Sequence, residues 1–370
     1  MRRTPSHDIL LTGPLFLDIV FTGLPHEPRT GTEVWAEGMG TLPGGIANLA
    51  VACARLGLQA HLATSFGDDA YGQWCADILR EERIDLERSH VHTGVHTNVT
   101  VSYAHDDDRT MITHGHAMAC SADELIGEVP QVAAVAMDLT KERLAERWWQ
   151  RASADGAKVF ADAGWDPSEA WDPQLLAPLD ACYAFTPNEV EAKAYTGKDC
   201  PIVAARDLAE RVPLAVVTRG DDGAVAVDSS TGEEASAPAL PVAAIDPTGA
   251  GDVFISGLIV ANLAGRPLAE QLAFATLASS LSVQQFGGSL AAPGWGDLVD
   301  WNERRVRGEF GEEVARRYDF LPEMLPSGTC AQVRRAEATI ARLADVQSGS
   351  TRRLMQGLTS RRRRPNRRSS

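Results

Sequence analysis

The stretch Asp246-Pro247-Thr248-Gly249-Ala250-Gly251-Asp252 decides the interpretation of this 370-residue chain. It follows a strand-like run, residues 240–245, and opens an apolar segment, residues 253–263, typical of a buried helix. The first N–H groups of a helix have no partner inside it, so Gly249, Ala250 and Gly251 can donate to an anion. Asp252 brings a carboxylate into the first turn. The pattern predicts phosphoryl transfer to a hydroxyl, although a tight turn with a capping Asp has the same residues.

The composition excludes several classes of protein. A net charge of −15 argues against a general nucleic-acid or anionic-membrane surface. The six cysteines have no CxxC spacing, which suits reduced thiols, and no apolar run is long enough to span a membrane. The apolar run near the N-terminus is too short for a signal peptide. We therefore expect a soluble cytoplasmic protein.

Strand-like and helix-like segments alternate along most of the chain. This alternation is typical of an α/β fold with a mostly parallel sheet and crossover helices. The expected strands are residues 9–12, 60–66, 132–137, 158–162, 181–186 and 214–218. The expected helices are residues 48–58, 70–82, 142–152, 250–264 and 268–285.

Residues 97–114 break this rhythm, because apolar and polar residues alternate there with the period of a strand. They predict a hairpin that is either a lid or an ordinary sheet edge. A strand is also expected at Glu33–Glu37, followed by a glycine-rich loop at Gly38–Gly45. Asp18 is expected on a loop just beyond the first strand, where ligands of α/β sheets gather.

The chain changes character after residue 300. Residues 303–317 and 331–345 alternate charges on a helical period, which predicts two peripheral helices in an extension over residues 301–345. The last twenty residues hold eight Arg and no acid. We expect residues 346–370 to be a disordered, solvated tail, and nucleic-acid contact is the less favoured alternative.

The chain has no Walker loop and no dinucleotide fingerprint, so a bound nucleotide would have to be held by other motifs. Two further motifs suit this role. Asn188 and Glu191 share a helix face, where they can reach phosphate oxygens and a hydrated Mg²⁺. An ordinary helix cap explains the same pair. The turn from Thr218 to Gly223 ends a strand with paired glycines, as a plain hairpin turn also does.

Three residues invite a metal interpretation. His114, His116 and Cys120 lie close together in the sequence, but no second Cys or His pair stands at ligand spacing. Ordinary surface histidines are the favoured interpretation.

Together these motifs resemble the ribokinase-like (pfkB) carbohydrate kinases over about residues 8–300. The matching elements, in order, are Gly44-Gly45 with Asn48, Asn188 with Glu191, the Thr218–Gly223 turn and DPTGAGD at residues 246–252. Residues 274–293 (FATLASSLSVQQFGGSLAAP) are similar to the family's closing element beside the adenine. The resemblance implies a three-layer α/β/α sandwich with a small β-sheet lid over about residues 14–40 and 97–115. It also implies ATP and Mg²⁺ as cofactors.

The resemblance implies a role for each matched position. Asp252 is expected to be the catalytic base, and Gly249, Ala250 and Gly251 the anion hole for the transferred γ-phosphoryl group. The positions expected to hold the sugar are Asp18, Gly44, Gly45 and Asn48. The positions expected to contact the nucleotide are Asn188, Thr218, Gly220 and Gly223, with Glu191 holding Mg²⁺ through water. The lid is expected to make the contact of a homodimer.

Two departures from the family pattern affect these expectations. Pro43 stands where the family has its first glycine, and Ala291 stands where many members have a polar residue near a monovalent cation beside Asp246. A K⁺ ion at Asp246 therefore stays open. Few basic residues lie near the sugar positions, which favours an unphosphorylated sugar.

Three alternatives for the function remain open. A phosphosugar kinase would need a fixed cation, for which Arg109 is a candidate. A nucleoside kinase would need apolar walls, for which Phe16, Trp35 and Tyr103 are candidates. A catalytically idle relative would act as a binding or regulatory subunit.

Overall fold

A central sheet of eight strands, in the order β14-β13-β12-β11-β10-β9-β1-β4, organises the computed structural model. The structure describes residues 8–105, 108–116, 120–163, 171–328 and 333–336. The sheet is parallel from β4 to β12, and β13 and β14 are antiparallel. The expected α/β fold with a mostly parallel sheet is confirmed. The strands in chain order are Asp8–Thr12 (β1), Gln59–Ala63 (β4), Ala134–Leu139 (β9), Lys158–Ala163 (β10), Ala184–Phe185 (β11), Leu214–Thr218 (β12), Ala224–Asp228 (β13) and Glu233–Ala237 (β14).

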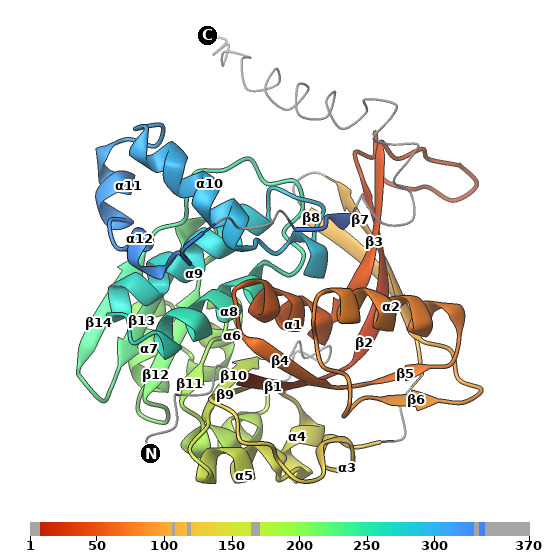
Figure 1. The fold of residues 1–370 in the computed structure, drawn as a ribbon, viewed down its shortest axis with the longest axis horizontal. Helices are drawn as coiled ribbons and strands as arrows, with labels where there is room; N and C mark the ends of the chain where they lie inside the picture. The colour runs from red at the N-terminus through yellow and green to blue at the C-terminus, as the bar shows by residue number, and fades with distance from the viewer. Residues whose placement is uncertain (1–7, 106–107, 117–119, 164–170, 329–332, 337–370) are drawn as a thin grey trace.

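Helices cover both faces of this sheet (Figure 1). Successive strand residues point to opposite faces, so Ile9 and Leu11 pack with one helical layer and Leu10 packs with the other. The first layer contains Ile46–Arg55 (α1), Ala70–Glu81 (α2), Ala250–Leu263 (α8) and Leu268–Ser282 (α9). The second layer contains Ala122–Ile126 (α3), Trp148–Ala154 (α5), Glu189–Thr196 (α6) and Pro201–Leu208 (α7). These layers form the expected three-layer sandwich.

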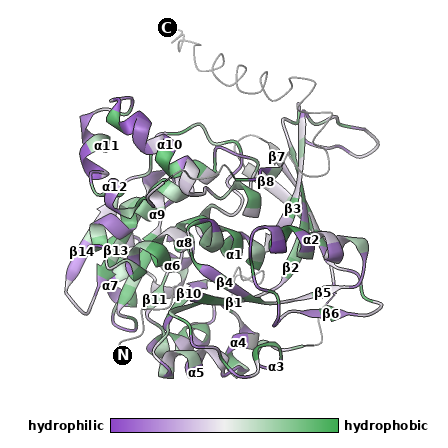
Figure 2. Cartoon of the chain, in the orientation of Figure 1, coloured by the Kyte–Doolittle hydropathy of each residue, from purple (hydrophilic) through white to green (hydrophobic). Residues whose placement is uncertain are grey.

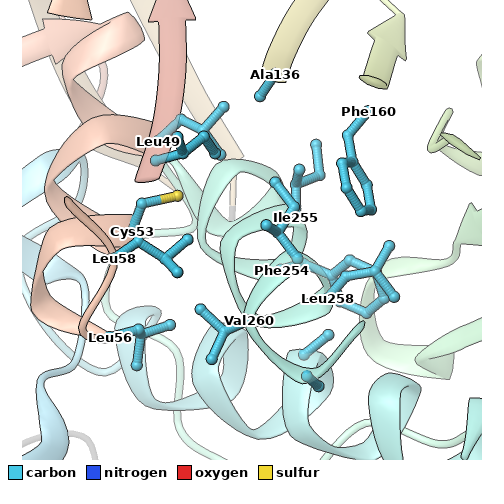
Figure 3. Packing of buried hydrophobic residues seen from close by; sticks show 14 of the residues in the cluster. Leu49, Cys53, Leu56, Leu58, Ala136, Phe160, Phe254, Ile255, Leu258 and Val260 are labelled. Carbon is cyan, nitrogen blue, oxygen red and sulfur yellow. The ribbon is translucent and has the colours of Figure 1, made fainter. Parts of the chain in front are cut away.

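Helix α8 is deeply buried in the first layer. Ten consecutive residues, Val253 to Asn262, are buried, because the segment is apolar on every side. Figure 3 shows Phe254, Ile255 and Leu258 of α8 packed between α1 and the sheet residue Phe160. This packing fixes the helix, and with it the position of the loop that precedes it.

A second sheet, in the order β3-β2-β7-β8, stands beside the sandwich as the expected lid (Figure 1). Its strands are Leu15–Thr22 (β2), Gly38–Gly45 (β3), Asn98–His105 (β7) and Asp108–His114 (β8). Two expectations were wrong here. Asp18 lies within β2 and not on a loop, and the strand is Gly38–Gly45, while Glu33–Glu37 is irregular. Pairing with the hydrophobic β2 orders the glycine-rich segment, which has little strand propensity of its own.

Three other expected elements differ in detail. The run 240–245 forms no strand, the helix expected at 142–152 is divided into Lys141–Ala145 (α4) and α5, and the strand expected at 60–66 is divided. Its second part, Ser65–Gly67 (β5), pairs with His90–His92 (β6) in a small separate sheet. A 3-10 segment, Pro173–Ala181 (η1), precedes β11, and two shorter ones are Gly220–Asp222 (η2) and Ser289–Ala291 (η3).

More of the residues after 295 are buried in the core than the charge pattern predicts. They form Trp295–Val306 (α10), Glu312–Arg317 (α11) and Leu321–Met324 (α12), so the expected helix over 303–317 is interrupted. Gly308 and Gly311, both with positive φ, cause the break. Trp301 and Tyr318 are almost fully buried in the main cluster, while the outer face of α11 is hydrophilic (Figure 2).

Only residues 333–336 are described of the helix expected at 331–345, and residues 333–335 are not helical. The expected tail, 346–370, lies outside the described residues. Arg335 donates to Asp297 at 2.6 Å, and Ala336 is buried beside Phe286, against the lid residue Gly40. The extension therefore returns to the lid. Among the described helices, none is long and apolar enough to cross a membrane.

Candidate active site

The loop before α8 is held in shape by its own hydrogen bonds. The buried Asp246 carboxylate accepts from the Thr248 N–H at 2.9 Å, from the Thr248 hydroxyl at 2.7 Å and from the Gly287 N–H at 3.1 Å. Gly249 caps the helix with φ 74° and ψ 5°, a left-handed conformation that suits glycine. The Ala250 N–H donates to the Pro247 carbonyl at 3.1 Å. Of the three expected anion donors, Ala250 is thus already engaged in the turn.

Asp252 lies in the first turn of α8 and meets a residue from the far end of the chain. The Asn48 amide, on α1, donates to the Asp252 Oδ2 at 3.1 Å. Asn48 is buried, and its Oδ1 has no hydrogen-bond partner among the described residues. A Cβ on Gly249 would lie 3.4 Å from the same amide group. The contact joins the expected catalytic base to one expected sugar position.

The other expected sugar positions gather where β2 meets the end of β3. A Cβ on Gly44 would lie 1.8 Å from a carboxylate oxygen of Asp18, so only glycine leaves room for this buried acid. Gly45 has φ 63°, and a Cβ there would lie 2.3 Å from the Pro14 carbonyl oxygen. Pro43 retains a place in β3, where its carbonyl accepts from the Ser289 hydroxyl. The two positions thus require glycine for separate physical reasons.

On the opposite side of the α8 N-terminus lies a pocket. Ala250 and Gly251 line it together with Thr218, Gly220 and Gly223, which brings the expected anion hole to the expected nucleotide turn. The other lining residues are Ala239, Phe254, Thr276, Ser279 and Ser280. The last three come from the segment 274–293, but the sequence did not distinguish them individually.

Asn188 and Glu191 form a reciprocal helix cap at the start of α6. The Asn188 Oδ1 accepts from the Glu191 N–H at 3.0 Å, and the Glu191 Oε2 accepts from the Asn188 N–H at 2.8 Å. The alternative interpretation as a cap is therefore confirmed as a structural role. Glu191 is buried, and this burial raises its pKa. A buried carboxyl group with a raised pKa is a plain candidate for a cation ligand.

The sequence interpretation missed Asp162, which lies one residue before the end of β10 and near Glu191 and Asp252. The withdrawal of its carboxyl group from water raises its pKa well above the ordinary value, and the charges of Glu191, Asp252 and Asp138 raise it further. Asp162 pairs with Asp138 of β9 across the sheet, and Arg143 offsets only the latter, at 3.2 Å. Three carboxyl groups, at positions 162, 191 and 252, therefore influence one another at the carboxyl edge of the sheet, although among the described residues their oxygens do not all come within 4.8 Å of one another. Carboxylate oxygens are the ligands that the hard Mg²⁺ prefers, and at this spacing water would complete the contacts to the ion.

Two arginines occupy the surroundings of Ala291. Arg55 donates to the carbonyls of Leu290, at 3.2 Å, and Ala292, at 2.6 Å. Arg335 donates to the carbonyls of Ala291, at 3.0 Å, and Ala292, at 3.2 Å. Fixed positive charges thus lie beside Ala291, the position at which many members of the family have a polar residue.

The aromatic residues named for a nucleoside do not gather at the sugar positions. Tyr103 pairs with Phe21, an odd position of β2, and so lies on the opposite face of the lid from Asp18. Trp35 is 78% exposed, and only Phe16 shares the face of Asp18. The side chain of Arg109, named for a phosphosugar, lies outside what the structure describes.

Comparisons with known proteins agree with this arrangement. The sequence profile described as pfkB family carbohydrate kinase matches residues 19–294. The chain is 29% identical to the ribokinase of Bacillus subtilis over 290 residues, covering 77% of this chain and 96% of that protein. It is 32% identical to the fructoselysine 6-kinase of Shigella flexneri over 253 residues, covering 66% of this chain and 90% of that protein.

A solved structure shares the fold. The ribokinase of Arabidopsis thaliana, solved with ribose and ATP, superposes with a TM-score of 0.64 at 23% identity, covering 78% of this chain and 96% of that one. The chain belongs to the pfkB family of carbohydrate kinases, and the fold is that of the ribokinases.

Proposed function

We propose that the protein transfers the γ-phosphoryl group of ATP to a hydroxyl of an unphosphorylated sugar. One observation carries the proposal: the first turn of α8 belongs to two sites at once. Asp252 is bonded to Asn48 on the side of the lid, while Ala250 and Gly251 line the pocket of Thr218 and Gly220. A hydroxyl held near Asp18 and a phosphate held in the pocket would meet at this turn.

In the proposed step, Asp252 takes the proton of the sugar hydroxyl while the oxygen of that hydroxyl attacks the γ-phosphorus of ATP. The bond between that phosphorus and the bridging oxygen breaks, which yields the sugar phosphate and ADP. The Asn48 amide orients the carboxylate, and the N–H groups of Gly249 and Gly251 stabilise the charge that builds on the phosphoryl oxygens. Glu191 and Asp162 would hold Mg²⁺, which neutralises charge on the phosphates.

The lid favours a polyhydroxylated substrate. The face of the lid that carries Asp18 also carries Asn98, Thr100 and Ser102 of β7, because these residues pair with alternate positions of β2. Strands β2, β3 and β7 bring no Lys or Arg to this face, so a second phosphate would find no cation from them. Side chains with hydroxyl and amide groups match the hydroxyls of a sugar.

A coupled assay of ADP release tests the proposal. The panel contains simple sugars, a fructosamine such as fructoselysine, phosphosugars and nucleosides, each with ATP and Mg²⁺. We expect the highest kcat/KM for an unphosphorylated sugar or sugar derivative. Turnover of a phosphosugar or nucleoside alone would replace the substrate class, and no turnover with retained sugar binding would favour an idle relative.

We also infer a homodimer through the lid. β8 is one of the two edge strands of the lid sheet, and its Met111 and Ile112 are 52% and 66% exposed. An exposed apolar edge strand is a template for pairing with another chain. Light scattering coupled to gel filtration should give the mass of a dimer, and Ile112→Lys should give a monomer, with Val306→Lys (71% exposed, on α10) as the control. A monomeric wild-type protein would contradict the inference.

A further inference from the structure

Three histidines converge at the base of the lid, outside the site described above. His96 lies two residues before the start of β7, His114 ends β8, and His116 follows two residues later. The His96 Nε2 lies 3.2 Å from the His114 Nε2 and 2.9 Å from the His116 Nε2. We propose that these three imidazoles bind one divalent transition-metal ion, with Zn²⁺ as the ion that suits them best.

The spacing of the three nitrogen atoms suits a metal. Zn²⁺ binds imidazole nitrogen at about 2.0–2.1 Å, and in a tetrahedral site the ligand atoms then lie about 3.3 Å apart. The two separations at His96 are close to that value, and all three ligand atoms lie within 4.8 Å of one another. His96 is half-buried and His114 and His116 are exposed, so the rings have room to turn toward a common ion. The fourth position faces solvent and would take water.

Hydrogen bonding among the rings does not account for the cluster. The His96 Nδ1 lies 3.0 Å from the Thr97 carbonyl oxygen, which only accepts, so Nδ1 carries the hydrogen. In the neutral ring, Nε2 then offers a single lone pair, although two other imidazole nitrogens lie within reach of it. One lone pair cannot serve both well. A cation between the rings would accept a lone pair from each.

The bond from Nδ1 to Thr97 is also what a metal ligand requires. Imidazoles that bind a metal usually donate their other ring N–H to a carboxylate or backbone carbonyl, which fixes the tautomer. Thr97 is itself held by Asp69, which accepts from the Thr97 N–H at 3.1 Å and hydroxyl at 2.8 Å. The ligand from the start of the hairpin is therefore held in place before an ion arrives.

The other two ligands are tied to the same hairpin. The His116 N–H donates to the Asn98 Oδ1 at 2.9 Å, and a Cβ on Gly115 would lie 2.2 Å from that oxygen. An ion bound to His96, His114 and His116 would thus clamp the start of β7 to the end of β8. Asn98 lies on the lid face that carries Asp18, so the clamp would also fix that face.

The metal content of untagged protein tests the proposal. Wild-type protein, loaded with Zn²⁺ and dialysed, is compared with His114→Ala/His116→Ala, in which both replaced residues are exposed. We expect the double variant to hold one Zn²⁺ fewer per chain. A second group, His90, His92 and Cys120, has ligand atoms equally close together, and it is the same in both proteins, so only the difference counts. Equal Zn²⁺ content would overturn the proposal.

A spectrum and a matched variant complete the test. Co²⁺ in place of Zn²⁺ should give visible bands of low-symmetry coordination in wild type, weakened in the double variant and unchanged in His26→Ala. His26 is an exposed histidine whose Nδ1 lies 2.8 Å from the carbonyl oxygen of the neighbouring Glu27. A Co²⁺ spectrum identical in wild type and the double variant would refute the site. None of these measurements depends on turnover, so they are independent of the proposed reaction.

Discussion

The two sides of the α8 N-terminus are built from different kinds of groups. The pocket side is built mainly from backbone and small side chains, such as Gly220, Gly223 and Gly251. The lid side is built from side chains that form hydrogen bonds, with Asp18 packed against Gly44 and Asn48 bonded to Asp252. Backbone donors suit a phosphate that every member of a kinase family must bind. Placed side chains instead discriminate among sugars, so substrate choice should be decided in the lid.

Asp252 serves both sides, and its replacement should have the largest effect. Asp252→Asn keeps an amide in place of the carboxylate but removes the proposed base. We expect kcat to fall by about 10²–10⁴-fold, with ATP binding and the thermal unfolding midpoint near wild type. Turnover and calorimetric ATP binding measure the two quantities. Near-wild-type kcat would remove Asp252 from the role of base.

Two glycines separate the sides most directly. Gly44→Ala drives a methyl group into Asp18, so we expect the KM for sugar to rise about 10–100-fold with little change for ATP. Gly251→Ala is the matched control, because a Cβ there meets nothing within 4 Å and its backbone is helical. That methyl group should raise the KM for ATP and leave the sugar KM unchanged. The same shift in both variants would show that the two sides are not separate.

We expect Asp162 to lower the stability of the protein without Mg²⁺ and to strengthen the binding of the cation. Its raised folded pKa means that ionisation opposes folding, so its stabilising contribution falls as pH rises above the ordinary value of 3.8. Without Mg²⁺, Asp162→Asn should therefore melt at a higher temperature than wild type at pH 7, and the difference should shrink toward pH 4. The Mg²⁺ concentration for half-maximal activity should rise about 10-fold.

The control for this prediction is Asp155→Asn, which replaces an exposed carboxylate at the end of α5. It should change neither the melting temperature nor the Mg²⁺ requirement. If Asp162→Asn melts below wild type at pH 7, the carboxylate is stabilising, and the account of three repelling acids is incorrect.

The central sheet and the lid differ in how far the sequence predicted them. The strands of the central sheet are short apolar runs buried on both faces, so β1, β9, β10 and β12 follow from local sequence. β3 reads GMGTLPGG, and only its pairing with β2 makes it a strand. Local propensity also could not place Asp18 in a strand of the lid. Its strand, β2, begins directly after Gly13-Pro14, where the sequence predicts a turn and a loop.

The candidate site was predicted where a motif carries its own geometry. Ala250 and Gly251 line one pocket with Thr218, Gly220 and Gly223, because each of the two turns is formed by neighbouring residues. Asp162 was missed, since nothing in the sequence around it distinguishes it, and only the folded chain brings it opposite Asp138 and near Glu191. His96 was missed as a partner of His114 and His116, because the hairpin joins residues 18 and 20 positions apart.

The smallest expected effect concerns K⁺. The Asp246 carboxylate already accepts three hydrogen bonds, from Thr248 and Gly287, and these leave little capacity for an ion. Arg55 and Arg335 supply fixed positive charge to the carbonyls beside Ala291. Replacing K⁺ by tetramethylammonium at constant ionic strength should therefore change kcat/KM by less than about twofold. Arg335→Ala would remove one of these charges, so K⁺ dependence that appears only in that variant would show that the arginine stands in for the ion, whereas strong dependence in wild type would show that Asp246 binds K⁺ despite its hydrogen bonds.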